Sequence, residues 1–251
     1  MTASIFRPQQ LIAHRGQSAT YPENTIIALE AAVAAGARAI EVDVQCLADD
    51  TPILFHDINF KRVCADNRKL FSIDKSQLGE LSAYEPSRFG DEFKGTPIAT
   101  LEELVSFLEQ HPDIHCFVEI KKQSIRKMGK LNCLKMLDQV LAPVHTQCTL
   151  LSYHRGFVET ALKQNHFPIG LIIRFRWQLR RLNPALAVCF CDVKRMRKKD
   201  NLHELPVRIA VYEVSEKALV SQWLDRGARW IETNDIEKLL NETPEPTWHS
   251  A

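Results

Sequence analysis

The stretch LIAHRGQSATYPENTIIALEAAVAAGARAIEVDV, residues 11–44, predicts a strand, a helix and a second strand in that order. The apolar runs at 11–14 and 39–44 have the length of buried strands. Between them, residues 25–36 carry apolar side chains at helical spacing and end at Gly36, a residue type that commonly terminates helices. This order is typical of parallel strands joined by a crossover helix.

The same alternation continues along the chain. Further strands are predicted at 52–56, 116–121, 148–153, 169–173, 185–190, 208–214 and 229–233, and further helices at 101–111, 131–141, 156–165 and 216–227. About eight strand–helix units predict an α/β fold, a single (β/α)8 TIM barrel domain over residues 1–251. Residues 57–99 interrupt the rhythm with charged and polar residues, so we expect a small insertion there. A doubly wound open sheet is the alternative, but no GxGxxG motif follows the first strand.

The composition excludes several classes of protein. Hydrophobic residues make up 45% and charged residues 25% of the chain, which is typical of a globular protein. A formal net charge of +1 gives no field that would attract nucleic acid. No apolar run approaches the roughly 18 residues of a transmembrane helix, and no signal peptide is evident, so we expect no membrane insertion. The 7 cysteines form no CxxC pair, which indicates reduced thiols and a cytoplasmic location.

Two carboxylates share one face of the predicted strand at 39–44. Glu41 and Asp43 are two residues apart, so their side chains point to the same side. Buried carboxylates this close repel each other unless a cation lies between them. Oxygen ligands without cysteine favour one divalent cation, Mg²⁺ or Ca²⁺. For the pair alone, a strand end that projects into solvent is the more common explanation.

Other predicted strands also end in chemically active residues. The first strand ends in His14 and Arg15, and the run at 52–56 ends in His56. Glu119 and Lys121 again lie two apart on one predicted strand. In a barrel these side chains converge at the carboxyl-terminal rim, where active sites are built. The loop residues Glu23 and Asn24 are expected to fix the segment that positions His14.

These residues carry a resemblance to a known family. HRGQSATYPENT at 14–25, EVD at 41–43, HD at 56–57 and EIK at 119–121 resemble the glycerophosphodiester phosphodiesterases in order and spacing. The segment 57–104, which ends in GDEFKGTPIATLEEL, also resembles the insertion of that family. The chain departs from the family near its end, where Thr233-Asn234 replaces a common Thr-Asp.

The resemblance implies a (β/α)8 barrel that binds a divalent cation and hydrolyses a small-molecule glycerophosphodiester to sn-glycerol 3-phosphate and an alcohol. By position it implies the following roles: metal ligands Glu41, Asp43 and Glu119, an acid/base pair His14 and His56, and phosphate-binding side chains Arg15 and Lys121. The chemistry is consistent with these roles. A cation polarises the phosphoryl oxygens, a guanidinium offers a fork to two of them, and histidines exchange protons near neutral pH.

Several alternatives remain open at this point. The attacking group is either water or the glycerol hydroxyl, and the second route passes through a cyclic phosphate. A related phosphodiesterase of lysophospholipid or phosphoinositide-like substrates is the second enzyme candidate. A catalytically silent barrel that binds phosphorylated ligands is the third, although it would have no need of both histidines and all three carboxylates. Residues 174–199 contain nine Lys or Arg, which we interpret as a solvated outer face rather than a surface for an anionic partner.

Overall fold

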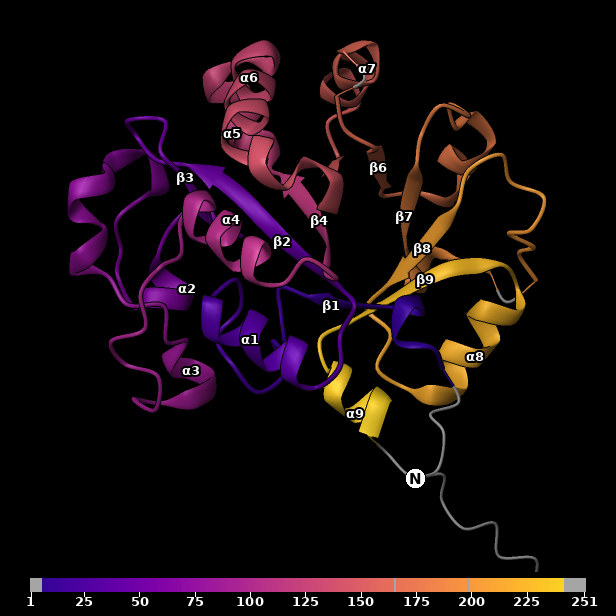
Figure 1. Ribbon diagram of the computed structural model, residues 1–251, viewed down its shortest axis with the longest axis horizontal. Coiled ribbons are helices and arrows are strands. Elements are labelled where there is room, and N and C mark those ends of the chain that lie inside the picture. The colour runs from indigo at the N-terminus through magenta and orange to yellow at the C-terminus, as the bar shows by residue number, and fades with distance from the viewer. Residues whose placement is uncertain (1–5, 165, 198, 242–251) are drawn as a thin grey trace, which may run out of the picture.

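The computed structural model describes residues 6–164, 166–197 and 199–241 and confirms the (β/α)8 barrel (Figure 1). Eight parallel strands close on themselves, because β1 pairs with both β2 and β9. The barrel strands are β1 (Leu11–His14), β2 (Ala39–Cys46), β4 (His115–Ile120), β5 (Cys148–Ser152), β6 (Ile169–Ile173), β7 (Val188–Asp192), β8 (Ile209–Tyr212) and β9 (Ala228–Thr233).

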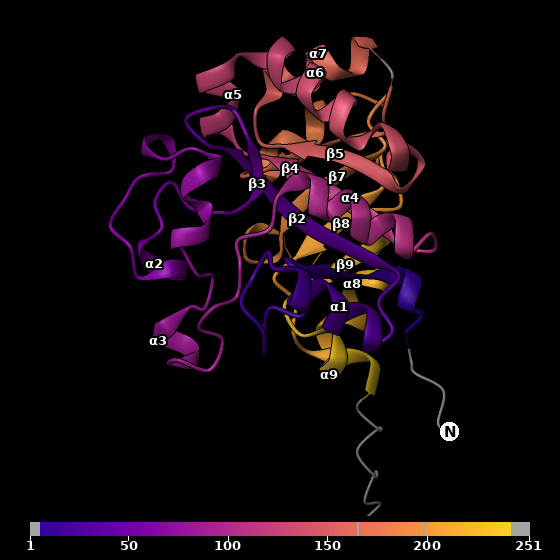
Figure 2. The same cartoon turned by 60° about the vertical axis from the view of Figure 1, so that its left-hand side comes forward.

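Helices surround the barrel on the outside (Figures 1 and 2). They are α1 (Ile26–Ala34), α4 (Leu101–Gln110), α5 (Lys122–Met128), α6 (Lys130–Leu141), α7 (Arg155–Gln164), α8 (Lys217–Asp225) and α9 (Ile236–Asn241). In the described residues, the helical structure of the connections after β6 and β7 is limited to the short 3-10 turns Arg176–Arg181 and Val193–Arg195. No helix in the described part of the chain is long and apolar enough to span a membrane.

Alternation along β2 separates the outer core from the barrel interior. Ile40, Val42 and Val44 are fully buried and belong to the large apolar cluster beneath the helices. Ala39 belongs instead to the inner cluster, which also contains Ile12, Phe117, Leu151 and Phe190. Because side chains alternate along a strand, Glu41 and Asp43 share the inner face with Ala39. The same strand therefore stabilises the barrel with one face and supplies carboxylates with the other.

The strand predicted at 52–56 is present as β3 (Pro52–Leu54), but it is not one of the parallel barrel strands. It pairs antiparallel with β2, with Val44 opposite Leu54 and Cys46 opposite Pro52. The loop 47–51 is too short for a crossover helix, and such a loop can only join antiparallel neighbours. The reversal carries the chain back towards the barrel, so that the Phe55 amide donates to the carbonyl of Asp43.

Residues 57–99 lie beside β2, β3 and α1 (Figure 2). This segment contains α2 (Lys61–Cys64), α3 (Pro86–Phe89) and the 3-10 turns Leu70–Ser72 and Lys75–Glu80. It has an apolar cluster of its own, built on residues such as Phe60, Leu70, Ile73 and Ile98 together with Ile53 of β3. A separate small core accounts for the ordered structure of a segment that has many charged and polar residues.

A close backbone approach holds the loop after β1 against α1. Gly16 has φ +84°, and a Cβ atom on it would lie 2.6 Å from the backbone carbonyl carbon and oxygen of Ala28. The Gln17 amide donates to the same carbonyl at 2.8 Å, and Thr25 caps the helix by accepting from the Ala28 amide. The loop that carries His14 and Arg15 is thus packed directly onto the first turn of α1.

Replacing Gly16 with alanine is expected to lower the free energy of unfolding by roughly 1–3 kcal/mol, because the new methyl group meets backbone atoms that cannot rotate away. Gly79→Ala is the matched control, since nothing lies within 4 Å of the added Cβ and its φ is not positive. The control should stay within about 0.5 kcal/mol of the parent. Urea denaturation of the three proteins measures both effects, and equal stability of the two variants would contradict this account of the loop.

Candidate active site

The carboxyl-terminal ends of the barrel strands surround two neighbouring cavities, of about 160 Å³ and 400 Å³. Six of the seven residues singled out in the sequence line the smaller one: His14, Arg15, Glu41, His56, Glu119 and Lys121. The seventh, Asp43, is fully buried beneath them and contacts Arg15 and Lys121. A larger cavity of about 690 Å³ lies at the amino-terminal ends of the strands and is lined by none of these seven residues.

Three buried carboxylates come from two adjacent strands. Asp43 of β2 and Glu119 of β4 are register partners, and Glu41 precedes Asp43 on the same face. One oxygen from each of the three lies within 4.8 Å of the others, so the group can hold a metal ion. Burial, together with the charge of Asp43, raises the pKa of Glu41 well above its usual value. The Oε2 atom of Glu41 is buried without a hydrogen-bond partner.

Two cations and an amide bind the central carboxylate. Arg15 Nε lies 2.8 Å from Asp43 Oδ2, and Lys121 Nζ lies 2.6 Å from Oδ1. Lys121 also contacts Glu119 Oε1 at 3.0 Å. Asn24 donates from its side chain to Asp43 Oδ2 and accepts from the Asp43 amide. Although burial alone would raise the pKa of Asp43, Arg15 and Lys121 hold it well below its usual value.

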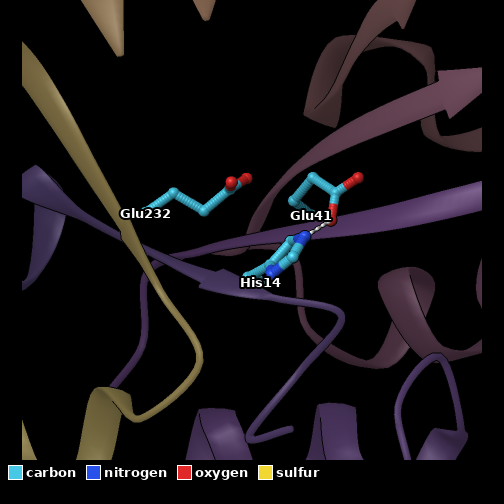
Figure 3. A group of neighbouring side chains, drawn as sticks. All are labelled: His14, Glu41 and Glu232. Atoms are coloured by element: carbon cyan, nitrogen blue, oxygen red, sulfur yellow. Dashed lines mark ion pairs between the residues drawn. The ribbon is translucent and has the colours of Figure 1, made fainter. Parts of the chain in front are cut away.

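The His14 imidazole is held in one orientation at the end of β1. Its Nδ1 lies 2.6 Å from the side-chain oxygen Oδ1 of Asn234. An amide oxygen can only accept a hydrogen bond, so Nδ1 carries the proton. The other nitrogen, Nε2, points towards Glu41 Oε2 at 3.8 Å (Figure 3), and His14 lines the smaller cavity. Burial and the charge of Arg15 lower the pKa of His14 to about 4. The side chain is therefore neutral at pH 7 with a lone pair directed into the site.

His56 reaches the same cavity by a different route. His56 follows β3, which runs antiparallel to β2. It therefore reaches the rim through this reversal of the chain, whereas the other site residues lie at the ends of parallel barrel strands. Its Nδ1 lies 2.7 Å from Asp57 Oδ1, and Asp57 Oδ2 accepts from Arg62 Nε at 2.7 Å. Although burial would raise the pKa of Asp57, hydrogen bonds from His56 and Arg62 hold it well below its usual value. With a side chain 38% exposed, His56 is the more accessible of the two histidines.

Glu23 links the loop after β1 to the segment at 57–99. Its Oε1 accepts from Arg15 at 2.9 Å and from Arg62 Nη2 at 2.6 Å. Its backbone amide donates to the buried Glu85 at 2.7 Å. Asn24 and Glu23 thus both hold the loop beside His14, Asn24 through Asp43 and Glu23 through the segment at 57–99.

Glu232 is a further buried side chain in this site, and no motif in the sequence marks it. Glu232 lies on β9, is 4% exposed, and lines the same cavity as His14 and Glu41. Burial, together with the nearby Asp43 and Glu119, raises the pKa of Glu232 to about 8. Its sequence signal was a single carboxylate within the apolar run RWIET, near the end of a predicted barrel strand.

The basic stretch at 174–199 does not behave as one surface. Arg180 and Arg181 are exposed, as predicted for a solvated face. Arg174 and Arg195, by contrast, line the 400 Å³ cavity together with His56 and Glu119. The prediction of a uniform outer face is therefore incomplete, because the segments after β6 and β7 return to the rim. Lys198 lies outside the described residues.

Comparison with known proteins assigns the chain to a class and then to a family. A closed (β/α)8 barrel with carboxylates and two histidines at its carboxyl-terminal rim has the arrangement of a barrel enzyme. The chain matches the Glycerophosphoryl diester phosphodiesterase family over residues 14–238 and belongs to it.

Individual relatives agree with this assignment. A glycerophosphodiester phosphodiesterase of Caldanaerobacter subterraneus subsp. tengcongensis is 25% identical over 92% of this chain and 96% of its own length. Glycerophosphodiester phosphodiesterase 1 of Bos taurus is 30% identical over 125 residues, which span 50% of this chain but only 38% of that protein.

Solved structures share the fold. A phosphodiesterase of Oleispira antarctica, in complex with the product sn-glycerol-3-phosphate, superposes with a TM-score of 0.80 at 21% identity and covers 92% of this chain and 94% of its own. A glycerophosphodiester phosphodiesterase from Agrobacterium tumefaciens superposes with a TM-score of 0.74 at 17% identity, with coverage of 93% and 100%. At these identities the likeness establishes the fold.

The low pKa of His14, about 4, predicts a pH dependence of stability. The unfolded chain takes up this proton near pH 6.5, whereas the folded protein takes it up only near pH 4. Stability from the neutral His14 is therefore complete above pH 6.5 and is lost as pH falls towards 4, by an amount on the order of 3 kcal/mol. Chemical denaturation between pH 4 and 7 measures this loss.

His14→Gln serves as the control for that measurement, because it keeps a donor for Asn234 and cannot titrate. Other carboxylates titrate in both proteins, so the difference between the two curves reports His14. Parallel curves over the whole range would show that His14 keeps an ordinary pKa.

Proposed function

We propose that this chain hydrolyses glycerophosphodiesters to sn-glycerol 3-phosphate and an alcohol, with the help of one divalent cation. The observation that carries the proposal is the convergence of Glu41, Asp43 and Glu119 with two oriented histidines around one cavity. The product complex of the Oleispira antarctica relative supports the choice of substrate. In this proposal residues 1–251 form one barrel domain and 57–99 are an insertion within it.

The carboxylate group fits a hard cation. Glu41, Asp43 and Glu119 each bring one carboxylate oxygen within 4.8 Å of the others, and Lys121 contacts both Asp43 and Glu119, which supports a need for positive charge at this group. Oxygen donors alone suit Mg²⁺ or Ca²⁺. When bound there, the cation would polarise the phosphoryl oxygens of a diester.

Arg15 and Lys121 supply the remaining positive charge at the phosphate. Both line the cavity, and both are held in place by Asp43. A phosphodiester carries one negative charge, which repels an attacking oxygen until it is neutralised. Because these two side chains are already fixed by buried ion pairs, they need little reorganisation when substrate binds.

The two histidines are placed to move the protons. His14 is neutral and presents the Nε2 lone pair, so it would accept the proton of the attacking hydroxyl as the new P–O bond forms. His56 is held at Nδ1 by Asp57, which leaves Nε2 to donate a proton to the departing alkoxide as the old P–O bond breaks. The attacking hydroxyl is that of water, or that of the glycerol moiety when the route passes through a cyclic phosphate.

The proposed setting is the cytoplasm. All 7 cysteines are buried and free, including Cys189 and Cys191, whose sulfurs lie 3.9 Å apart without a disulfide. A chain with several free thiols suits a reducing compartment. The partner we propose is therefore a small-molecule diester encountered there.

Removing one carboxylate should weaken the cation site. Asp43→Asn is expected to reduce the affinity for Mg²⁺ or Ca²⁺ at least tenfold or so, because the site loses a charged ligand and the Arg15–Lys121 arrangement loses its anchor. Isothermal titration calorimetry of the purified chain measures this affinity. Asp91→Asn is the matched control, since that carboxylate contacts only Lys94 at the surface. Unchanged affinity in Asp43→Asn would remove Asp43 from the metal site.

The acid/base pair is tested with two substrates. His14→Ala and His56→Ala should each lower kcat on glycerophosphocholine by about 10²–10⁴-fold. A nitrophenyl diester needs no proton on its leaving group, so the His56 variant should recover much of its rate there while the His14 variant stays slow. His166→Ala, at an exposed position, controls for the substitution itself.

The rates of the two histidine variants on the two substrates separate three possible roles. If neither variant recovers its rate on the nitrophenyl diester, the histidines orient the substrate or bind its phosphate and do not transfer protons. Wild-type rates on the natural diester would rule out the acid/base roles.

A further inference from the structure

A second set of metal-type ligand atoms lies on the other side of Glu41. His14 of β1, Glu41 of β2 and Glu232 of β9 come from three neighbouring strands, and one ligand atom of each lies within 4.8 Å of the others. Figure 3 shows the Glu232 carboxylate extending towards His14 and Glu41. Glu41 thus belongs to two groups, this one and the one formed with Asp43 and Glu119.

The state of His14 matches that of a metal ligand. Its Nδ1 donates to Asn234 at 2.6 Å, so the lone pair on Nε2 faces the two carboxylates. Ligating histidines in proteins usually have this second hydrogen bond, which fixes the ring and its tautomer. Two buried acids beside an imidazole lone pair are unfavourable in their ionised form, and a cation between them would stabilise that form.

No Lys or Arg in the described part of the chain pairs directly with Glu41 or Glu232, although the charge of Arg15 acts on both from nearby. Arg15 forms its ion pairs with Glu23 and Asp43, and Lys121 forms its ion pairs with Asp43 and Glu119. Glu41 is 3% exposed, and its Oε2 atom, which faces His14, has no hydrogen-bond partner. This unpartnered buried oxygen, independent of the clustering itself, indicates where a ligand is missing.

We propose that His14, Glu41 and Glu232 form a second cation site, which takes a borderline transition-metal ion such as Zn²⁺ or Co²⁺. An imidazole nitrogen with two carboxylates suits these ions better than Mg²⁺ or Ca²⁺, which prefer oxygen ligands alone. Three protein ligands leave further coordination positions open to the cavity. Glu41 would offer one oxygen to each site.

Occupation of this site changes what His14 does. An ion on Nε2 uses the lone pair that would otherwise accept a proton, so the ion inhibits hydrolysis. This consequence rests on the proposed function, whereas binding of the ion does not.

The binding experiment titrates the full chain with Co²⁺ in saturating Mg²⁺ and follows visible absorption together with bound stoichiometry. In saturating Mg²⁺, which occupies the carboxylate site, wild type should still bind one equivalent of Co²⁺. Its absorption spectrum should show the d–d bands of a site with mixed nitrogen and oxygen ligands. Glu232→Gln should lose these bands or weaken binding at least tenfold or so. Glu159→Gln, an exposed glutamate on α7, is the control and should bind as wild type does. Circular dichroism verifies that each variant is folded.

A measurement on wild type alone guards against a misfolded variant. Of the 9 histidines, only His14 should show a large ¹⁵N shift at Nε2 when Zn²⁺ is added. The site would be overturned if wild type bound no Co²⁺ in saturating Mg²⁺, or if folded Glu232→Gln kept the wild-type Co²⁺ spectrum. A Zn²⁺-induced shift at another histidine would also overturn it.

The inhibition is measured separately, as the Zn²⁺ concentration that halves each protein's own zinc-free rate. This concentration should rise at least tenfold in Glu232→Gln relative to wild type. Hydrolysis that persists with Co²⁺ or Zn²⁺ bound would overturn the inhibitory role while the site stands. Absence of any hydrolysis with Mg²⁺ would refute the proposed function and leave the binding result unaffected.

Discussion

The buried ion pairs of Asp43 are the contacts on which the rest of the site depends. A carboxylate in the interior of a barrel is unfavourable unless it is paired and hydrogen-bonded. Arg15 from the loop after β1, Lys121 after β4 and Asn24 before α1 all meet this one group. Through it, three segments far apart in the chain are held at the rim, and removal of one partner would leave charge uncompensated.

The same contacts make the electrostatics of the cavity uneven. Both cations of the inner rim face Asp43, so this half is nearly balanced by the protein itself. Glu41 and Glu232 lie on the other half beside His14, where burial and neighbouring acids raise the pKa of both. The negative charge of Glu41 and Glu232 can remain unbalanced by protein side chains, because a cation from solution can bind there and neutralise it.

Most of the architecture was predictable because it depends on local periodicity. Apolar side chains recur every second residue in a strand and every three or four residues in a helix, so the two can be told apart in the sequence. The predicted runs at 11–14, 39–44 and 169–173 correspond to β1, β2 and β6. The sequence predicts no helix between the strands at 169–173, 185–190 and 208–214, and the described residues there contain the short 3-10 turns Arg176–Arg181 and Val193–Arg195. The direction of β3 was not predictable from its apolar run, since period alone does not distinguish a hairpin partner from a parallel neighbour.

The sequence by itself determined the family, the barrel and the seven residues of the candidate site, because each of these follows from motif order and from the period of two along single strands. Only the tertiary structure decided how these residues meet. The return of β3 brings His56 to the rim, Asn234 sets the proton on His14, and β9 places Glu232 beside Glu41. These facts depend on register and distance between segments up to 220 residues apart, and such contacts leave no pattern in the local sequence.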